Sequence, residues 1–261
     1  HYTLIPKIAA NRLSTTNARA GVLLKVWFKE FQLPGHADLF PWPELGDLPL
    51  GLQLETLKEG TPLPLAAASV LWAYEEAKAQ ANNEAFFPGI SIANHTTLLD
   101  HSQMSADIKS AKIKIGNNEV TNWHEVESLI KKFPGTRWRL DFNGLFHNLD
   151  EGYNFWEKVC EEAKQSIDFI EDPVSEELMS FEDLREVFVD ARIALDRSGN
   201  PLAWRNADVL VLKPVLFAPD ILLSMAMQFP GDVVITSSMD HPLGQLIALR
   251  GAQLVKKASG K

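Results

Sequence analysis

The segment 167–214 contains three short apolar runs, IDFIEDP (167–173), ARIALD (191–196) and ADVLVLKP (207–214), and each run ends with charged residues. Each run has the length of a buried strand, and the residues between the runs can hold a helix or a tight connection. Strands that alternate with helices are typical of a parallel sheet, because each crossover returns the chain to the same end of the sheet. The segment therefore predicts consecutive βα units.

The same alternation continues on both sides of this segment. Further strands are expected at 90–94, 111–116, 137–143 and 232–238, and helices at 122–133, 218–229 and 242–252. Seven strands at this spacing favour a closed barrel over an open sheet. A doubly wound nucleotide-binding sheet would need a Gly-x-Gly fingerprint, and no two of the 15 glycines are two residues apart. The sequence therefore predicts the α/β class, as a modified (β/α)7β TIM-type barrel.

Residues 1–86 follow another pattern and are predicted to form an N-terminal α+β capping domain, with the barrel domain at 87–261. The apolar run 20–28 is expected to be a strand, and the Ala- and Leu-rich segment 64–81 a helix. The Pro- and Gly-rich stretch 33–51 is expected to hold little regular structure. The C-terminal tail of the barrel is a candidate to return to the cap.

Composition excludes several classes of protein. The chain has 261 residues, with 25 Lys and Arg against 34 Asp and Glu and a formal charge of −9. Without a basic tract, an acidic chain is a poor partner for nucleic acid or anionic membranes. It has no apolar run of about 18 residues for a membrane helix, one cysteine, and no signal-peptide layout at its start. We expect a cytoplasmic enzyme or binding protein, and the sequence leaves its oligomeric state open.

Polar residues follow the apolar part of consecutive strands, at the end where barrel active sites lie. Three consecutive strands end in the carboxylates Asp141, Glu171 and Asp196. Buried like charges repel one another unless a cation lies between them. Carboxylates without His or Cys suit a hard, oxygen-seeking ion, and Mg²⁺ also keeps positions for water and substrate. The sequence therefore predicts a magnesium site formed by these three residues.

Lysines and further polar residues flank the predicted metal ligands. Lys112 and Lys114 precede them and share one face of their strand, because strand side chains alternate. By the same alternation, Arg139 and Asn143 share a face with Asp141. Lys213 ends the sixth strand, and the seventh strand ends with Ser237 and Ser238.

The order of these motifs resembles a known family. Lys-Ile-Lys, Arg-Leu-Asp-Phe-Asn, Ile-Glu-Asp-Pro, Ala-Leu-Asp and Leu-Lys-Pro follow one another as in the muconate-lactonizing subgroup of the enolase superfamily. That superfamily uses a Lys or His base together with Mg²⁺. Within it, the chain is most similar to the o-succinylbenzoate synthase family, through PWPELG (41–46), VLKP (211–214) and SSMD (237–240). The resemblance extends over nearly the whole chain.

The resemblance implies a role for each candidate residue. Asp141, Glu171 and Asp196 correspond to the Mg²⁺ ligands, with Mn²⁺ as an alternative ion, and Lys114 and Lys213 to the catalytic lysines. The remaining candidates correspond to substrate-binding positions: Lys112, Arg139, Asn143, Ser237 and Ser238. The implied reaction is a syn-dehydration in menaquinone biosynthesis, which gives an aromatic dicarboxylate from a small carboxylate substrate. The family usually has a full helix after the first barrel strand, whereas this chain has about a dozen weakly helical residues there.

Other functions fit parts of the pattern. An N-succinylamino-acid racemase would use the same two lysines and would also bind a succinyl group. A dipeptide epimerase typically has an Asp-x-Asp near the last strands, where this chain has Ser-Met-Asp (238–240). A non-catalytic barrel would bind no divalent metal tightly, and intact lysines on both sides of the carboxylates argue against it.

Overall fold

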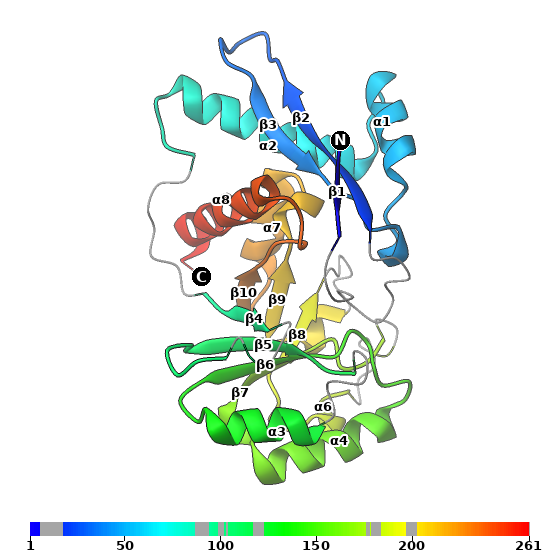
Figure 1. Cartoon of the computed structure of the whole chain (residues 1–261), viewed down its shortest axis with the longest axis vertical. Helices are drawn as coiled ribbons and strands as arrows, with labels where there is room; N and C mark the ends of the chain where they lie inside the picture. The colour runs from blue at the N-terminus through cyan, green and yellow to red at the C-terminus, as the bar shows by residue number, and fades with distance from the viewer. Residues whose placement is uncertain are drawn as a thin grey trace. The chain divides into compact units, whose positions relative to one another are not determined.

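The structure is a computed structural model, drawn in Figure 1. It describes residues 1–5, 18–86, 94–98, 102, 104–116, 123–175, 178, 184–196 and 203–260. The chain forms two compact units, one of His1–Ile92 with Leu212–Lys261 and the other of Ala93–Val211. These units group residues by packing, so the predicted domain boundary at residue 86 remains a prediction.

The N-terminal residues form a small antiparallel sheet with a helix packed on it. Its strands, in spatial order, are β1 (Tyr2–Leu4), β2 (Arg19–Val26) and β3 (Gly35–Leu39). Helix α2 (Pro64–Ala81) has the bounds that the sequence predicted, and its small buried face packs on β3. The helix comes so close that a Cβ on Gly35 would lie 1.7 Å from the Ala73 carbonyl oxygen. Only glycine fits at the start of β3.

The expectation of little regular structure at 33–51 is wrong for part of that stretch. It contains β3, the 3-10 turn η1 (Pro43–Leu45) and the start of helix α1 (Leu50–Lys58). Strand β3 pairs antiparallel with β2 from Val26↔Gly35 to Val22↔Leu39. The strand forms because β2 on one side and α2 on its face stabilise it, and such tertiary contacts leave no local sequence signal.

The second sheet is a curled parallel half-barrel of seven strands, in the order β10-β9-β8-β7-β6-β5-β4. The strands are β4 (Thr96–Leu98), β5 (Ser110–Lys114), β6 (Arg137–Asp141), β7 (Ile167–Glu171), β8 (Ile193–Asp196), β9 (Val209–Leu212) and β10 (Asp232–Ile235). Strands β5 to β10 overlap the runs that predicted them. Most of the run 90–94 lies outside the described residues. The predicted α/β class and its barrel-type sheet are confirmed.

Helices and short turns connect these strands. They are α3 (Trp123–Lys132), α4 (Leu149–Glu162), η4 (Lys164–Ser166), α6 (Leu184–Val187), η5 (Ala203–Asn206), η6 (Pro214–Leu216), α7 (Pro219–Gln228) and α8 (Pro242–Ser259). Figure 1 shows α3 and α4 along one face of β5, β6 and β7. Helix α3 turns its apolar stripe of Val126, Leu129 and Ile130 inward. Of the segment between β4 and β5, the described residues 104–109 form no helix.

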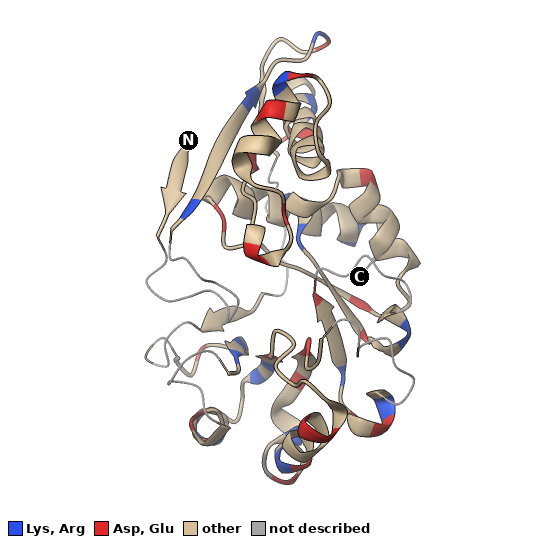
Figure 2. Cartoon of the chain, turned by 90° about the vertical axis from the view of Figure 1, so that its right-hand side faces the viewer, with Lys and Arg blue, Asp and Glu red and all other residues tan. Residues whose placement is uncertain are grey.

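The C-terminal segment belongs to the same compact unit as the N-terminal sheet. The Trp72 indole N–H donates hydrogen bonds to the carbonyl oxygens of Pro214 (2.8 Å) and Phe217 (2.9 Å). Helix α8 packs against β3 and α7. The described helices include none with the length and apolarity that a membrane crossing requires. Figure 2 shows Lys and Arg residues interspersed with Asp and Glu residues along the chain.

Candidate active site

The carboxyl ends of β5, β6 and β7 bring the predicted polar residues into one row. The parallel register pairs Lys114 with Asp141, and Asp141 with Glu171. Asp196 ends β8, the next strand. Asp141 and Glu171 are almost fully buried, with exposed fractions of 3% and 2%. The structure therefore places Lys114, Asp141 and Glu171, which end consecutive strands, side by side.

Lys112 lies between two of the predicted metal ligands. Its Nζ is 2.5 Å from Glu171 Oε1 and 3.0 Å from Asp141 Oδ2. Burial alone would lower the pKa of Lys112, but the charges of Asp141, Glu171 and Asp196 outweigh burial and raise it. Lys112 therefore stays a cation and serves as a fixed counter-ion for the carboxylates.

Lys114 has a different environment from Lys112. Its Nζ lies 3.3 Å from Asp141 Oδ2 and donates a hydrogen bond of 3.2 Å to Asn143 Oδ1. Asn143 has a φ of 49°, and both its backbone N–H and its side-chain amide donate to Asp141 Oδ1. Asn tolerates this left-handed conformation better than most residues. Asn143 thus orients both Asp141 and the Lys114 amine.

A third acid joins Glu171 and Asp196. Ligand oxygens of Glu171, Asp172 and Asp196 all lie within 4.8 Å of one another. Asp172 is not among the metal ligands that the sequence predicted. Its φ of 42° turns the chain at this point, and Asp172 Oδ1 accepts a hydrogen bond of 3.0 Å from the Asp196 backbone N–H. The left-handed backbone at Asp172 therefore brings its side chain beside Glu171 and Asp196, although it directly follows Glu171 in the chain.

We refer to Asp141, Glu171, Asp172 and Asp196, with Lys112 and Lys114, as the carboxylate cluster. Burial, followed by the charges of Asp196 and Glu171, raises the pKa of Asp172 well above its usual value. A divalent cation among these oxygens would remove that repulsion. Hard oxygen donors without His or Cys suit Mg²⁺ or Mn²⁺, so the residues fit the predicted ion.

Arg139, predicted to bind substrate, contacts Asp168 and His95 in the structure. Its Nε lies 2.9 Å from Asp168 Oδ2, and its Nη1 lies 2.6 Å from His95 Nδ1. The pairing of β6 with β7 shifts by one residue between Trp138 and Arg139, which leaves Asp168 facing the arginine. Burial, and then the charges of Arg139 and Lys112, lower the pKa of His95 to about 4.

Three predicted site residues belong to the other compact unit. Lys213 follows β9 and begins the turn η6, while Ser237 and Ser238 follow β10. The backbone N–H of the buried Ser238 lies 3.4 Å from Asp240 Oδ2. Burial and the nearby Asp38 raise the pKa of Asp240 to about 7, against the opposing effect of Lys213. Asp240, which ends the SSMD motif, is not among the predicted site residues.

The buried acids of this unit are tied to the N-terminal strands. The Tyr2 hydroxyl donates a 2.6 Å hydrogen bond to Asp38 Oδ1, and the His241 backbone N–H lies 3.2 Å from Asp38 Oδ2. These contacts connect β1 and β3 to the loop after β10.

The PWPELG motif (41–46) has a structural role in the same unit. The Arg19 side chain, 5% exposed, donates to Glu44 Oε1 from both Nε (2.8 Å) and Nη2 (2.6 Å). The same guanidinium lies 3.8 Å from the centre of the Trp42 ring. The motif therefore holds the N-terminal end of β2 through one arginine.

Comparison with known proteins gives consistent matches. Residues 1–79 match the family model described as O-succinylbenzoate synthase, N-terminal domain. An o-succinylbenzoate synthase from Bdellovibrio bacteriovorus is 31% identical over 275 residues, which cover 99% of this chain and 81% of that relative.

Solved structures share the fold over almost the whole chain. The o-succinylbenzoate synthase from Thermosynechococcus elongatus BP-1, complexed with Mg in its active site, has a TM-score of 0.68 and 18% identity, covering 97% of this chain and 87% of that one. The L-Ala-D/L-Glu epimerase from Bacillus subtilis has a TM-score of 0.74 and 17% identity, covering 98% and 85%. At these identities the likeness shows the fold alone.

Proposed function

Because the chain belongs to the o-succinylbenzoate synthase family of the enolase superfamily, we propose that it is a metal-dependent dehydratase. Its reaction is the syn-dehydration of 2-succinyl-6-hydroxy-2,4-cyclohexadiene-1-carboxylate to o-succinylbenzoate in menaquinone biosynthesis. The observation that carries the proposal is the in-register row of Lys114, Asp141 and Glu171 in a chain 31% identical to a named synthase.

Lys114 is the proposed base. As a neutral amine it takes the proton α to the substrate carboxylate, and the C–H electron pair moves into the ring system. The C–O bond to the β-hydroxyl then breaks, and the ammonium of Lys114 returns its proton to the departing hydroxide as water. The lysine ends as the neutral amine with which it began. The hydrogen bond from Lys114 to Asn143 holds the amine in position for both transfers.

The proposed metal ligands are Asp141, Glu171 and Asp196. Bound Mg²⁺, or Mn²⁺ in its place, supplies positive charge for the negative charge that develops on the substrate carboxylate. Lys112 assists by keeping Asp141 and Glu171 in fixed positions. Asp172 hydrogen-bonds the Asp196 backbone, and so it orients the third ligand.

The remaining candidates are proposed to bind the substrate. Lys213 stays cationic and stabilises the anionic ring, and Ser237 and Ser238 hold the succinyl group through backbone N–H groups. Lys112, Arg139 and Asn143 are proposed as the other substrate-binding positions. In the structure Arg139 contacts Asp168 and His95, so its effect on substrate would be indirect. We propose a small carboxylate as the only partner, without nucleic acid or membrane, and a cytoplasmic location.

The second candidate is an N-succinylamino-acid racemase. It is supported by the fold shared with the L-Ala-D/L-Glu epimerase structure and by the same pair of lysines, which could move a proton on either side of one carbon. Ser-Met-Asp at 238–240, in place of Asp-x-Asp, counts against a dipeptide epimerase.

The test compares the two reactions in one preparation. The protein is incubated with Mg²⁺ and the cyclohexadiene substrate, and separately with an N-succinylamino acid, and kcat/KM is measured for each. The synthase proposal expects efficient dehydration that EDTA abolishes and that Mg²⁺ or Mn²⁺ restores. Dehydration that is indifferent to EDTA contradicts the mechanism, and racemisation much faster than dehydration transfers the function to the second candidate.

A further inference from the structure

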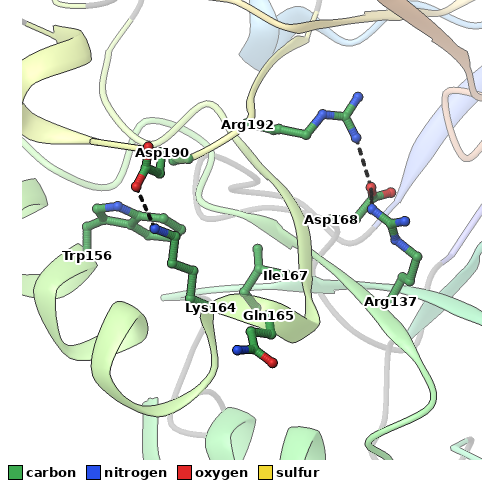
Figure 3. A pocket seen from close by; sticks show the side chains of 9 residues that line it. Arg137, Trp156, Lys164, Gln165, Ile167, Asp168, Asp190 and Arg192 are labelled. Carbon is green, nitrogen blue, oxygen red and sulfur yellow. Dashed lines mark hydrogen bonds and ion pairs between the residues drawn. The ribbon is translucent and has the colours of Figure 1, made fainter.

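We propose that the amino ends of β6, β7 and β8 form a second binding site, which takes a small ligand with an anionic oxygen group. Phosphate esters and dicarboxylates share this chemistry. The site is the pocket of about 410 Å³ in Figure 3, lined by Arg137, Trp156, Lys164, Gln165, Ile167, Asp168, Asp190, Ala191 and Arg192.

The main feature of this site is an excess of guanidinium groups around one carboxylate. Asp168 Oδ1 lies 2.8 Å from Arg137 Nη2 and 3.0 Å from Arg192 Nη1, and Asp168 Oδ2 lies 2.9 Å from Arg139 Nε. We refer to Arg137, Arg139, Arg192 and Asp168 as the arginine cluster. Of these four, Arg137, Arg192 and Asp168 line the pocket. With Lys164 and Asp190, the lining holds three cations and two carboxylates, a formal excess of one positive charge in a protein whose formal charge is −9.

The other wall of the pocket adds a lysine. Lys164 Nζ lies 2.8 Å from Asp190 Oδ2, and Figure 3 shows this pair and the Arg137–Asp168–Arg192 group on opposite sides of Ile167 and Gln165. The Trp156 indole N–H donates to the Val189 carbonyl oxygen, which fixes the ring as part of the wall. The pocket therefore has Ile167 and Gln165 between two charged sides.

The arginines are placed to receive a ligand as well as to hold Asp168. The Arg137 side chain is 66% exposed and that of Arg192 is 39% exposed, whereas that of Asp168 is 8% exposed. A guanidinium has five N–H donors and binds phosphoryl or carboxylate oxygens in pairs. A volume of about 410 Å³ exceeds what a single water needs, about 30 Å³, and leaves room for an organic group beside the anion.

This pocket is separate from the proposed active site. Arg137 begins β6 and Asp141 ends it, so about 13 Å of strand lies between the two ends. None of the nine lining residues has a role in the proposed dehydration. A purely structural arginine cluster, which only fastens the strand ends together, is the competing explanation.

The test is anion-dependent thermal stability. Tm is measured in EDTA against rising inorganic phosphate and, separately, succinate, with sodium chloride at matched ionic strength. EDTA keeps the carboxylate cluster without its cation, so that dianions are repelled there. The proposal expects a saturable rise in Tm beyond the chloride control. The stronger of the two anions identifies the ligand as phosphoryl or dicarboxylate.

Variants assign the effect to the pocket. Arg137→Gln and Arg192→Gln should each raise the apparent Kd for the anion about tenfold or more, since each removes charged hydrogen bonds. Arg205→Gln makes the same charge change at an exposed position of the same unit and should leave the Kd unchanged. Lys114→Ala should also leave it unchanged, which separates this site from the proposed catalytic one.

Two results overturn the proposal: no saturable response to either anion, or a response of equal affinity in Arg137→Gln, Arg192→Gln and the parent protein. If Arg192→Gln fails to fold, Arg137→Gln and Lys164→Gln still decide the question. Both residues have substantially exposed side chains.

Discussion

At the carboxyl ends of β5 to β8, two lysines accompany four carboxylates. Toward the amino ends of β6 to β8, Arg137, Arg192 and the mid-strand Arg139 surround one carboxylate. The same strands thus carry a formal excess of two negative charges at one end and two positive charges at the other. Burial makes the two ends physically different. Asp141 and Glu171 are at most 3% exposed, while the side chains of Arg137 and Arg192 remain 66% and 39% exposed.

The difference in burial indicates which end of the strands depends on a bound ion. Buried carboxylates cannot be hydrated, so their excess charge must be offset by protonation, by lysine or by a metal. The exposed guanidiniums keep part of their hydration, so the arginine cluster is stable without a ligand and can still bind one. Removing charge partners should therefore cost more at the carboxyl end than at the amino end.

The largest expected effect is on catalysis at the carboxyl end. Lys114→Ala removes the proposed base, and kcat/KM for dehydration should fall by about 10² to 10⁴. Steady-state kinetics at saturating Mg²⁺ measures the loss. Lys109→Ala, at an exposed position just before β5, is the matched control and should keep the parent rate. A Lys114→Ala enzyme with a near-parental rate would place the chemistry on another residue.

Lys112→Met tests the counter-ion at the same end. It leaves Asp141 and Glu171 facing each other without their ammonium, which should lower the free energy of unfolding by about 3 to 5 kcal/mol. Urea unfolding with and without Mg²⁺ measures the effect. Mg²⁺ should recover part of the loss, because it also offsets the two carboxylates. If the loss is the same with and without the metal, the carboxylate cluster is no cation site.

Asp168→Asn makes the corresponding change at the amino end. Three guanidiniums lose their shared carboxylate, and we expect the free energy of unfolding to fall by about 2 to 3 kcal/mol. The loss is smaller than for Lys112→Met because Arg137 and Arg192 remain partly hydrated. Urea unfolding in chloride and in phosphate measures it. A loss larger than that of Lys112→Met would reverse the comparison between the two ends.

The sequence predicted the carboxyl end better than the amino end for physical reasons. Strand alternation and parallel register placed Asp141 and Glu171 in one row, because both rules hold inside a regular sheet. They do not extend to places where the backbone departs from regularity, such as Asp172, whose φ of 42° brings its side chain beside Glu171 and Asp196.

Other features could have been found in the sequence or only in the structure. Arg137 begins the predicted strand 137–143 and Arg192 is the second residue of the predicted strand 191–196, so the sequence already places both arginines at strand starts. Strand β3 gave no such signal, since its pairing with β2 and its packing on α2 are contacts distant in sequence.

The pKa of His95 depends on the charges of Arg139, Lys112 and Asp168. Its contribution to the free energy of unfolding is the smallest effect that we predict. Its folded pKa of about 4 lies below the usual 6.5, first through burial and then through the charges of Arg139 and Lys112. A histidine with a lowered pKa contributes stability above pH 6.5 and loses it as the pH falls toward 4. We expect that contribution to be about 1 to 2 kcal/mol, because the ring is partly exposed.

Imidazole NMR titration measures this pKa, with the signal assigned by its absence in His95→Gln. The negative charge of Asp168 raises the pKa of His95, so Asp168→Asn should lower it further. His95→Gln should in turn flatten the dependence of unfolding free energy on pH between 6.5 and 4. A His95 that titrates near 6.5 would mean that Arg139 lies elsewhere in solution. The arginine cluster would then hold two arginines in place of three, and the charge contrast between the strand ends would be weaker by one unit.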